Sequence, residues 1–175
     1  MKSLTILPLA DTPNLIVREI ESYDVKAFAG FMMQPRYQRY TAMRLRNDAE
    51  VAAFVLRSVA RQGDDRRNVF HLAAEERSSG EAIGDGFLIM QRDRTIELGW
   101  GVHPAMWSCG FGTEIGAALL GLSFERLKAK SVCARSCAQI PLRQNLRAAS
   151  AWSTKNAWQA TPWATGALKM LISMP

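Results

Sequence analysis

Three apolar segments separated by short polar turns occupy residues 69–102, and they constrain the fold more than any other feature. Val69–Ala74 and Ile83–Met90 flank a polar turn that contains Gly80, and Arg92–Arg94 separates the second segment from Thr95–Val102. Segments of this length joined by such short turns predict sequential antiparallel strands, because a parallel connection needs a dozen or more residues. The centre of the chain is therefore expected to be a three-stranded meander.

One strand and two helices are predicted before the meander. Leu15–Ile20 is typical of a short strand. Ser22 is a candidate N-cap for a helix that Pro35 ends, and Asn47 is a candidate N-cap for a second helix that Gly63 ends. Apolar residues recur at helical spacing within both segments.

A helix and a further strand are predicted after the meander. Apolar residues at helical spacing run from Gly112 to Lys128, and Ser131–Ser136 is typical of a strand. A strand, a helix and a returning strand indicate a parallel crossover. The expected fold class is α+β, an α/β arrangement in three layers.

Length and composition favour a single globular domain. The chain has 175 residues, of which 48% are hydrophobic and 22% charged. It has no run of 18 apolar residues, which excludes a membrane-spanning helix, and its N-terminus lacks a cleavage pattern typical of a signal peptide. Its three cysteines have no disulfide-framework spacing, so a cytoplasmic location is expected.

The net charge of +6 is unevenly distributed along the chain. All 16 acidic side chains lie within residues 1–125 together with 14 of the 22 basic ones, whereas residues 126–175 contain eight basic side chains and no acidic one. The first 125 residues are therefore slightly acidic and contain no nucleic-acid recognition motif. A basic nucleic-acid-binding module accordingly ranks last among the functions considered, and no nucleic-acid or membrane partner is expected.

A glycine-containing loop stands directly before the long predicted helix. Gly110 and Gly112 allow close approach of a ligand to backbone N–H groups at the positive end of that helix, which suits a phosphate. The spacing matches neither the P-loop nor the dinucleotide-binding motif. The same glycines are also typical of an ordinary turn before a core helix, and from spacing alone both interpretations stay open.

The longer block Ile96–Glu114 resembles the acetyl-CoA-binding core of the GNAT acyltransferase superfamily. The family pattern there is a Glu-Leu-Gly-Tyr/Trp strand, His/Asp-Pro, and then Trp-Gly-Gln-Gly-Tyr/Phe-Ala/Gly-Thr/Ser-Glu. This chain is most similar to the RimJ/RimL-type branch, which includes N-terminal acetyltransferases of ribosomal proteins. The resemblance covers residues 15–135 of one domain, 1–175, and leaves an atypical tail, 136–175. This C-terminal part is expected to be irregular, apart from Ala167–Ile172, which is typical of a short strand or a helical turn.

The resemblance implies a GNAT-type mixed, mostly antiparallel twisted sheet flanked by helices, and transfer of an acetyl group from acetyl-CoA to a primary amine by direct attack. The amine is a protein N-terminus or a small molecule, and the protein is expected to be a monomer or a homodimer. Ser108 and Cys109 replace the usual glycine and the usual Gln, Arg or Lys, but the main-chain donors remain. The implied acetyl-CoA contacts are Val102, Trp107, Ser108, Cys109, Gly110, Phe111, Gly112 and Thr113.

The resemblance also implies a catalytic role for Glu97, which stands where related enzymes present a carboxylate that deprotonates the amine through water. A solvated or ion-paired strand glutamate is the alternative. His71 and His103 are expected to be a hydrogen-bonded strand residue and a loop-packing residue. Cys109 is expected to be a passive small residue, and the cysteines have no metal-site spacing, so no metal is expected.

The resemblance ends after the strand Ser131–Ser136. The family continues with Asp-Pro-x-Asn-x-x-Ser, whereas Cys137–Arg143 contains neither the Asn nor the Ser in register. Acidic residues and both hydrophobic periods disappear together, and a neighbouring reading frame of Thr165–Ser173 can encode a family-like Arg-Phe-Glu-Asp-Val strand. We hypothesise that the end of the chain is read out of frame, which makes a CoA-binding relic with weak or no catalysis the main alternative function.

Overall fold

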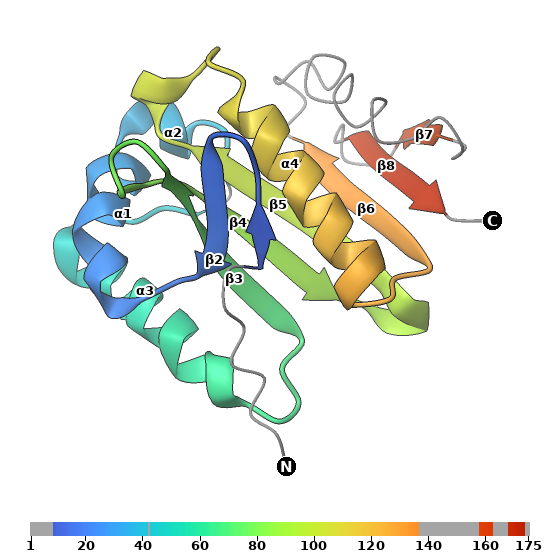
Figure 1. Cartoon of the computed structure of the whole chain (residues 1–175). Coiled ribbons are helices and arrows are strands. Elements are labelled where there is room, and N and C mark those ends of the chain that lie inside the picture. The colour runs from blue at the N-terminus through green and yellow to red at the C-terminus, as the bar shows by residue number, and fades with distance from the viewer. Residues whose placement is uncertain (1–8, 42, 137–157, 163–167, 174–175) are drawn as a thin grey trace.

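A mixed sheet forms the centre of the molecule. The computed structural model describes residues 9–41, 43–136, 158–162 and 168–173 (Figure 1). Within them the strand order is β1-β2-β3-β4-β5-β6-β8-β7. Only β5 and β6 pair in parallel, and all other neighbours are antiparallel, which confirms the predicted fold class. The strands are β1 (Ala10–Asp11), β2 (Leu15–Glu19), β3 (Val69–Glu76), β4 (Ala82–Met90), β5 (Thr95–Val102), β6 (Ser131–Ser136), β7 (Trp158–Pro162) and β8 (Leu168–Ser173).

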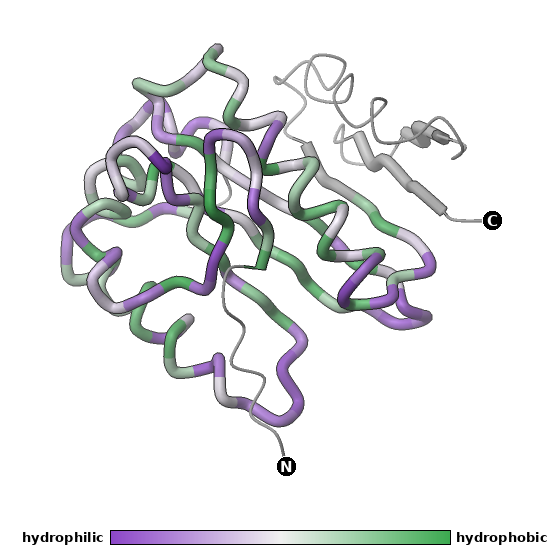
Figure 2. Tube along the Cα trace, viewed as in Figure 1, coloured by the Kyte–Doolittle hydropathy of each residue, from purple (hydrophilic) through white to green (hydrophobic). Residues whose placement is uncertain are grey.

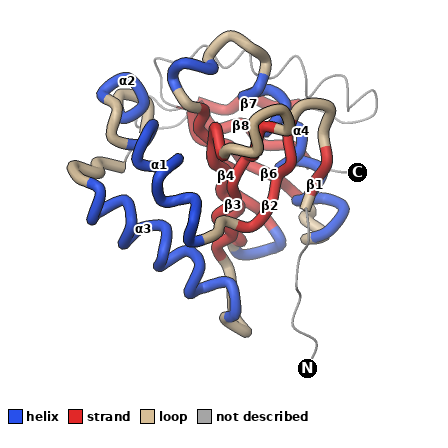
Figure 3. The backbone as a smooth tube through the Cα atoms, turned by 60° about the vertical axis from the view of Figure 1, so that its left-hand side comes forward, coloured by secondary structure: helices blue, strands red, loops and turns tan. Residues whose placement is uncertain are grey.

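Helices cover the two faces of the sheet and complete three layers. Figure 3 shows α1 (Val25–Met32), α2 (Pro35–Gln38) and α3 (Asp48–Ala60) on one side, and α4 (Phe111–Gly121) on the other. Figure 2 shows apolar stretches along α4 and the strands beneath it. Two cores result. The core under α4 includes Ile96, Leu98, Ile115 and Leu119. The core under α1 and α3 includes Phe28, Phe31, Val51, Val55 and Ala73.

The meander confirms the sequence prediction closely, with β5 at the predicted bounds, but the first helix begins differently. Ser22 does not cap it, because a 3-10 turn, Ser22–Asp24, precedes α1. The carboxylate of Asp24 instead accepts a hydrogen bond from the Glu21 N–H at 2.7 Å. Asn47 does cap α3, since its side chain accepts from the Glu50 N–H at 2.9 Å. Pro35 is the first residue of α2.

The long helix predicted from Gly112 to Lys128 is divided. α4 ends at Gly121, and a wider π-helical turn, Leu122–Arg126, follows. The Leu127 N–H donates to the Leu122 carbonyl at 3.0 Å, which is the i→i+5 spacing of a π turn. Apolar spacing alone does not distinguish this wider turn from a continued α-helix.

Two strands lie in the tail whose pattern gave no clear period. β8 pairs antiparallel with β6, and β7 pairs antiparallel with β8. Of the segment Ala167–Ile172, for which a strand and a helical turn were both left open, residues 168–172 belong to β8. β7 was not predicted and departs from the irregular tail that was expected. Residues 137–157 and 163–167, to which much of the reading-frame hypothesis refers, lie outside the described residues.

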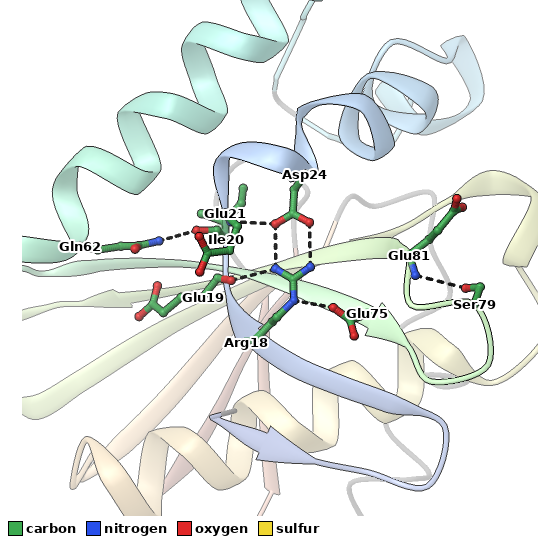
Figure 4. A network of polar contacts seen from close by, with 9 residues as sticks. All are labelled: Arg18, Glu19, Ile20, Glu21, Asp24, Gln62, Glu75, Ser79 and Glu81. Atoms are coloured by element: carbon green, nitrogen blue, oxygen red, sulfur yellow. Dashed lines mark hydrogen bonds and ion pairs between the residues drawn. The ribbon is translucent and has the colours of Figure 1, made fainter. Parts of the chain in front are cut away.

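A nearly buried arginine joins the start of α1 to the sheet (Figure 4). The guanidinium of Arg18 donates to both oxygens of Asp24 at 2.8 Å and to Glu75 at 2.6 Å. Burial alone would lower the pKa of Arg18, but the hydrogen bonds with Asp24 and Glu75 outweigh it and raise the pKa. The three charges therefore hold β2, the turn before α1 and β3 together.

Replacing Arg18 tests this junction. Arg18→Met is expected to lower the free energy of unfolding by about 3 kcal/mol, because it leaves the Asp24 carboxylate, 2% exposed, without its cation. Urea denaturation measures the change. Arg46→Met is the matched control, since Arg46 pairs with Glu50 with its side chain 82% exposed, and it is expected to cause no measurable loss. Equal losses in the two variants would contradict the role given to Arg18.

Candidate active site

The candidate site lies where β5 stops pairing with β6. The parallel pairing runs from Thr95 opposite Ser131 to Leu98 opposite Ala134. β5 then continues to Val102 without pairing to β6. From Gly99 onward, this edge of β5 therefore pairs with no strand in the part of the chain that the structure describes. In sheets with parallel strands, ligands bind beyond the carboxyl ends of such strands.

The loop after β5 is fastened back onto the strand that it leaves. The indole N–H of Trp107 donates to the Val102 carbonyl at 2.9 Å. His103 Nδ1 accepts from the Ala105 N–H at 3.0 Å, and its ring lies edge-on to Phe31, so His103 packs the loop as expected. The start of the loop is thus fixed before the glycine segment begins.

Two residues of the loop have left-handed backbone conformations. Ser108 has φ 68°, and Gly110, the N-cap of α4, has φ 89°. A residue with a Cβ carries a cost of about 1 kcal/mol in this region, which gives a physical reason for the glycine that the resemblance places at Ser108. The chain therefore keeps the loop geometry with a serine at a position better suited to glycine.

The loop leads directly into the first turn of α4. The N–H groups of Thr113 and Glu114 both donate to the Gly110 carbonyl at 3.1 Å. The preceding N–H groups, those of Phe111 and Gly112, belong to the first turn, which has no intrahelical acceptors. The structure thus brings together all the residues predicted to contact acetyl-CoA: Val102, Trp107, Ser108, Cys109, Gly110, Phe111, Gly112 and Thr113.

Sequence reasoning missed the neighbours of Trp107 on α2 and just beyond it. The Arg36 guanidinium lies 4.9 Å from the centroid of the Trp107 ring, and the Tyr40 ring lies edge-on to it at 5.7 Å. Residues 95–125 contain no Lys or Arg. Arg36 therefore brings a positive charge to a loop that has none, and nothing in the sequence indicated this contact.

Glu97 lies apart from the loop. It is five residues before Val102, which is about 16 Å along a strand. Its strand partners are Ile89 on β4 and Cys133 on β6, and the Gln91 amide donates to its carboxylate at 3.3 Å. Ile96 and Leu98 face α4, so the alternating Glu97 faces the side of α1–α3.

Glu114 fixes the N-terminus of α4 against the β1–β2 hairpin. Its carboxylate accepts from the Thr12 hydroxyl, from the Asn14 N–H at 2.7 Å and from the Asn14 side chain at 3.0 Å. Partial burial alone would raise the pKa of Glu114, but these hydrogen bonds outweigh it and lower the pKa. The ionised carboxylate therefore stabilises the folded state.

This anchor predicts an acid-dependent loss of stability. Because the folded-state pKa of Glu114 is lowered, its contribution is complete above the ordinary glutamate value of 4.5 and is lost as pH falls through the folded value. Glu114→Gln is expected to lower the Tm at pH 7, with the difference from the wild type shrinking on acidification. Differential scanning calorimetry from pH 7 to acid measures it, and a difference independent of pH would contradict the assignment.

The structure shows no metal centre in the part of the chain that it describes. Among those residues no group of three or more His, Cys, Asp or Glu side chains is placed to hold an ion. No helix among them is long and apolar enough to cross a membrane. His71, on β3, hydrogen-bonds to Ser58 and Asp85 as a strand residue was expected to do, away from the loop.

Solved acetyltransferases have the same fold. The ribosomal-protein-S5-alanine acetyltransferase of Vibrio fischeri superposes with a TM-score of 0.72 at 13% identity, covering 94% of each chain. The spermidine N-acetyltransferase of Vibrio cholerae, solved in complex with CoA and spermine, superposes with a TM-score of 0.70 at 13% identity, covering 93% of this chain and 96% of that one. The fold is therefore that of the N-acetyltransferases.

Sequence comparison then gives the family. Residues 14–139 match the model of the acetyltransferase (GNAT) domain, and the chain belongs to this family. The curated "Uncharacterized N-acetyltransferase YoaA" of Bacillus subtilis is 26% identical over 124 residues, which are 70% of each protein. The GNAT family predicted from the block Ile96–Glu114 is thus confirmed.

Proposed function

We propose that this protein transfers the acetyl group of acetyl-CoA to a primary amine, either a protein N-terminus or a small molecule, and that it belongs to the RimJ/RimL-type branch. The observation that carries the proposal is the continuous path from the free edge of β5 into the Trp107–Gly112 loop and the first turn of α4. Acetyl-CoA supplies the thioester that the amine attacks.

The residues of this path fit acetyl-CoA in chemistry and order. The main chain of β5 up to Val102 can pair with the amide groups of a pantetheine arm as a strand would. The N–H groups at the start of α4 donate to phosphate oxygens at the positive end of the helix. Arg36, beside Trp107, adds the positive charge that the loop lacks.

Acetylation of the amine requires a base that takes up its proton. In the reaction the amine nitrogen bonds to the acetyl carbon, the carbon–sulfur bond breaks, one proton leaves the nitrogen and the thiolate gains one. Glu97 is the carboxylate that we assign to remove the amine proton through water, since it faces the α1–α3 side next to the unpaired half of β5.

Binding of acetyl-CoA is the first test. Isothermal titration is expected to give a micromolar Kd for the wild type. Gly110→Ala is expected to weaken binding about tenfold, because a Cβ at φ 89° strains the loop that presents the N–H groups. Gly63→Ala is the matched control, because Gly63 lies just after α3, outside the loop, and no described heavy atom lies within 4 Å of its Cβ position. Absence of binding by the wild type would overturn the proposed function.

Turnover is the second test. Thiol release from acetyl-CoA is measured with spermidine and with a peptide that begins with alanine. Glu97→Gln is expected to lower kcat about 100-fold while the Kd of acetyl-CoA stays unchanged. Gln91→Leu, which removes the amide that contacts Glu97 and leaves the carboxylate in place, is expected to have a much smaller effect. Unchanged turnover in Glu97→Gln would contradict its role as the base.

A relic that binds CoA without turnover is the second candidate. The observation favouring it is that the family match ends at residue 139, close to where the sequence loses the Asn and Ser of the family pattern. Binding of acetyl-CoA with no thiol release to either amine would support this alternative. Sequencing the gene through residues 130–175 and translating its other frames tests the reading-frame hypothesis, which fails if no frame encodes a family-like helix.

A further inference from the structure

The segment from α1 to the start of α3 is strongly basic. Residues 25–47 contain five basic side chains and no acidic one. Four of the five are arginines that lie on α2 or in the segment that follows it, and all four are exposed: Arg36, Arg39, Arg44 and Arg46. An excess of one charge on so short a segment favours a ligand of the opposite charge.

α2 is fixed at the carboxyl end of β5. The Tyr37 hydroxyl donates to Asp85 Oδ1 at 2.6 Å, and both residues are buried. The helix approaches the strand closely, because a Cβ at Gly101 would collide with that hydroxyl. One residue earlier on α2, the Arg36 guanidinium lies over the Trp107 ring. Buried contacts thus place the exposed side of α2 next to the loop that is proposed to hold acetyl-CoA.

Within the described residues, no carboxylate pairs with Arg36 or Arg39. All 16 acidic side chains of the chain belong to that part, because residues 1–8, 42 and 137–175 contain none. Neither guanidinium donates a hydrogen bond to a described residue. The two cations of α2 are therefore open to an anion that comes from outside the chain.

The two arginines that follow α2 have partners within the protein. Arg44 donates to the carbonyls of Gln38 and Thr41 at 2.5 and 2.6 Å, and so closes the turn after the helix. Arg46 forms an ion pair with Glu50 on α3. The acceptors of Arg44 are uncharged, so its charge adds to the positive potential of this surface.

Arg36 and Arg39 are arranged to share one anion. Side chains three residues apart in a helix are neighbours on its surface, and two like charges at this spacing repel each other until an anion binds. Arg36 lies 4.9 Å from the centroid of the Trp107 ring, and Arg39 lies 5.9 Å from that of Tyr40. A guanidinium over an aromatic ring keeps its in-plane N–H groups free for a bidentate contact with a carboxylate or a phosphate.

We propose that Arg36 and Arg39 bind an anionic group of the acceptor, so that the protein acetylates amines of acidic molecules in preference to those of neutral or basic ones. This inference rests on the proposed function and names its substrate class. The anionic group is a carboxylate of a peptide close to its N-terminus or a phosphate of a small amine, and a guanidinium recognises both by the same geometry. A polyamine brings like charges to this surface and is a poor acceptor.

Matched acceptors test the preference. Three peptides of equal length begin with alanine and carry Glu, Gln or Lys at their next two positions. The KM of the wild type is expected to be about tenfold lower for the Glu peptide than for the Gln peptide, highest for the Lys peptide, and less different at high salt.

Phosphoethanolamine and ethanolamine form the second pair of acceptors. A preference for the anionic member in the peptide series, in the small-amine pair or in both supports the inference and identifies the source of the anion. Absence of a preference in both overturns it.

Replacing Arg39 tests the residue itself. Arg39→Gln is expected to raise the KM for the preferred anionic acceptor about tenfold, while the KM for its neutral counterpart and the Kd of acetyl-CoA stay unchanged. Arg39→Glu is expected to reverse the order of the Glu and Lys peptides. Arg92→Gln is the matched control, because Arg92 is also exposed and lies in the turn at the opposite end of β5. It is expected to change none of these constants.

The cofactor is the competing ligand for these arginines. A weaker Kd for acetyl-CoA in Arg39→Gln, with all acceptors affected equally, would assign the arginine to the cofactor and overturn the inference.

Direct binding separates this inference from the proposed function. Isothermal titration of the three peptides and of phosphoethanolamine into the protein saturated with CoA requires no turnover. Tighter binding of an anionic acceptor without thiol release supports the anionic site and overturns the proposed acetyl transfer. Equal binding, or no binding of any acceptor, overturns the inference, while acetyl transfer stands where thiol is released.

Discussion

The separation of β5 from β6 after Leu98 is the constraint on which the site depends. β5 is held on its other side throughout, since its register with β4 continues to Val102 opposite Gly84. The approach there is close, because a Cβ at Gly84 would lie 2.5 Å from the Gly101 carbonyl, and the His103 N–H donates to the Ile83 carbonyl at 2.7 Å. The end of β5 is thus fixed to β4, while its other edge pairs with no strand among the described residues.

The side chains of β5 alternate between the two faces of the sheet, and the two faces differ in what they contact. Trp100 packs under α4, where a Cβ at Gly116 would lie 3.0 Å from its ring, and Val102 also faces that helix. Gly99 and Gly101 face the other layer, where Tyr37 and Phe87 lie. The end of β5 therefore presents large residues to α4 and glycines to the α1–α3 side, where the missing Cβ of Gly101 lets Tyr37 approach the strand.

Sequence patterns predicted the helices and strands well where an element is determined by its own residues. The meander, the bounds of β5 and the Asn47 cap all depend on residues within a few positions of one another. The prediction of Ser22 as the cap was wrong. The carboxylate of Asp24, which Arg18 on β2 holds in place, accepts the Glu21 N–H instead.

The candidate site was likewise predicted only where its residues are close together in the sequence. The loop contacts lie in one continuous segment, so a motif predicted them. Arg36 and Trp107 meet only through the position of α2, and no spacing in the sequence relates them.

The tail contributes to the fold and to the chemistry through different groups of the chain. β8 pairs with β6 from Ser131 opposite Ser173 to Ser136 opposite Leu168, so β6 does not become an exposed edge. Such pairing uses main-chain groups, which every residue except proline provides in full. Proton donation to a leaving thiolate needs a particular side chain at a particular position. A tail can therefore complete the sheet through its main chain while its sequence departs from the family pattern, which is consistent with structural similarity over 94% of the chain and a family match that ends at residue 139.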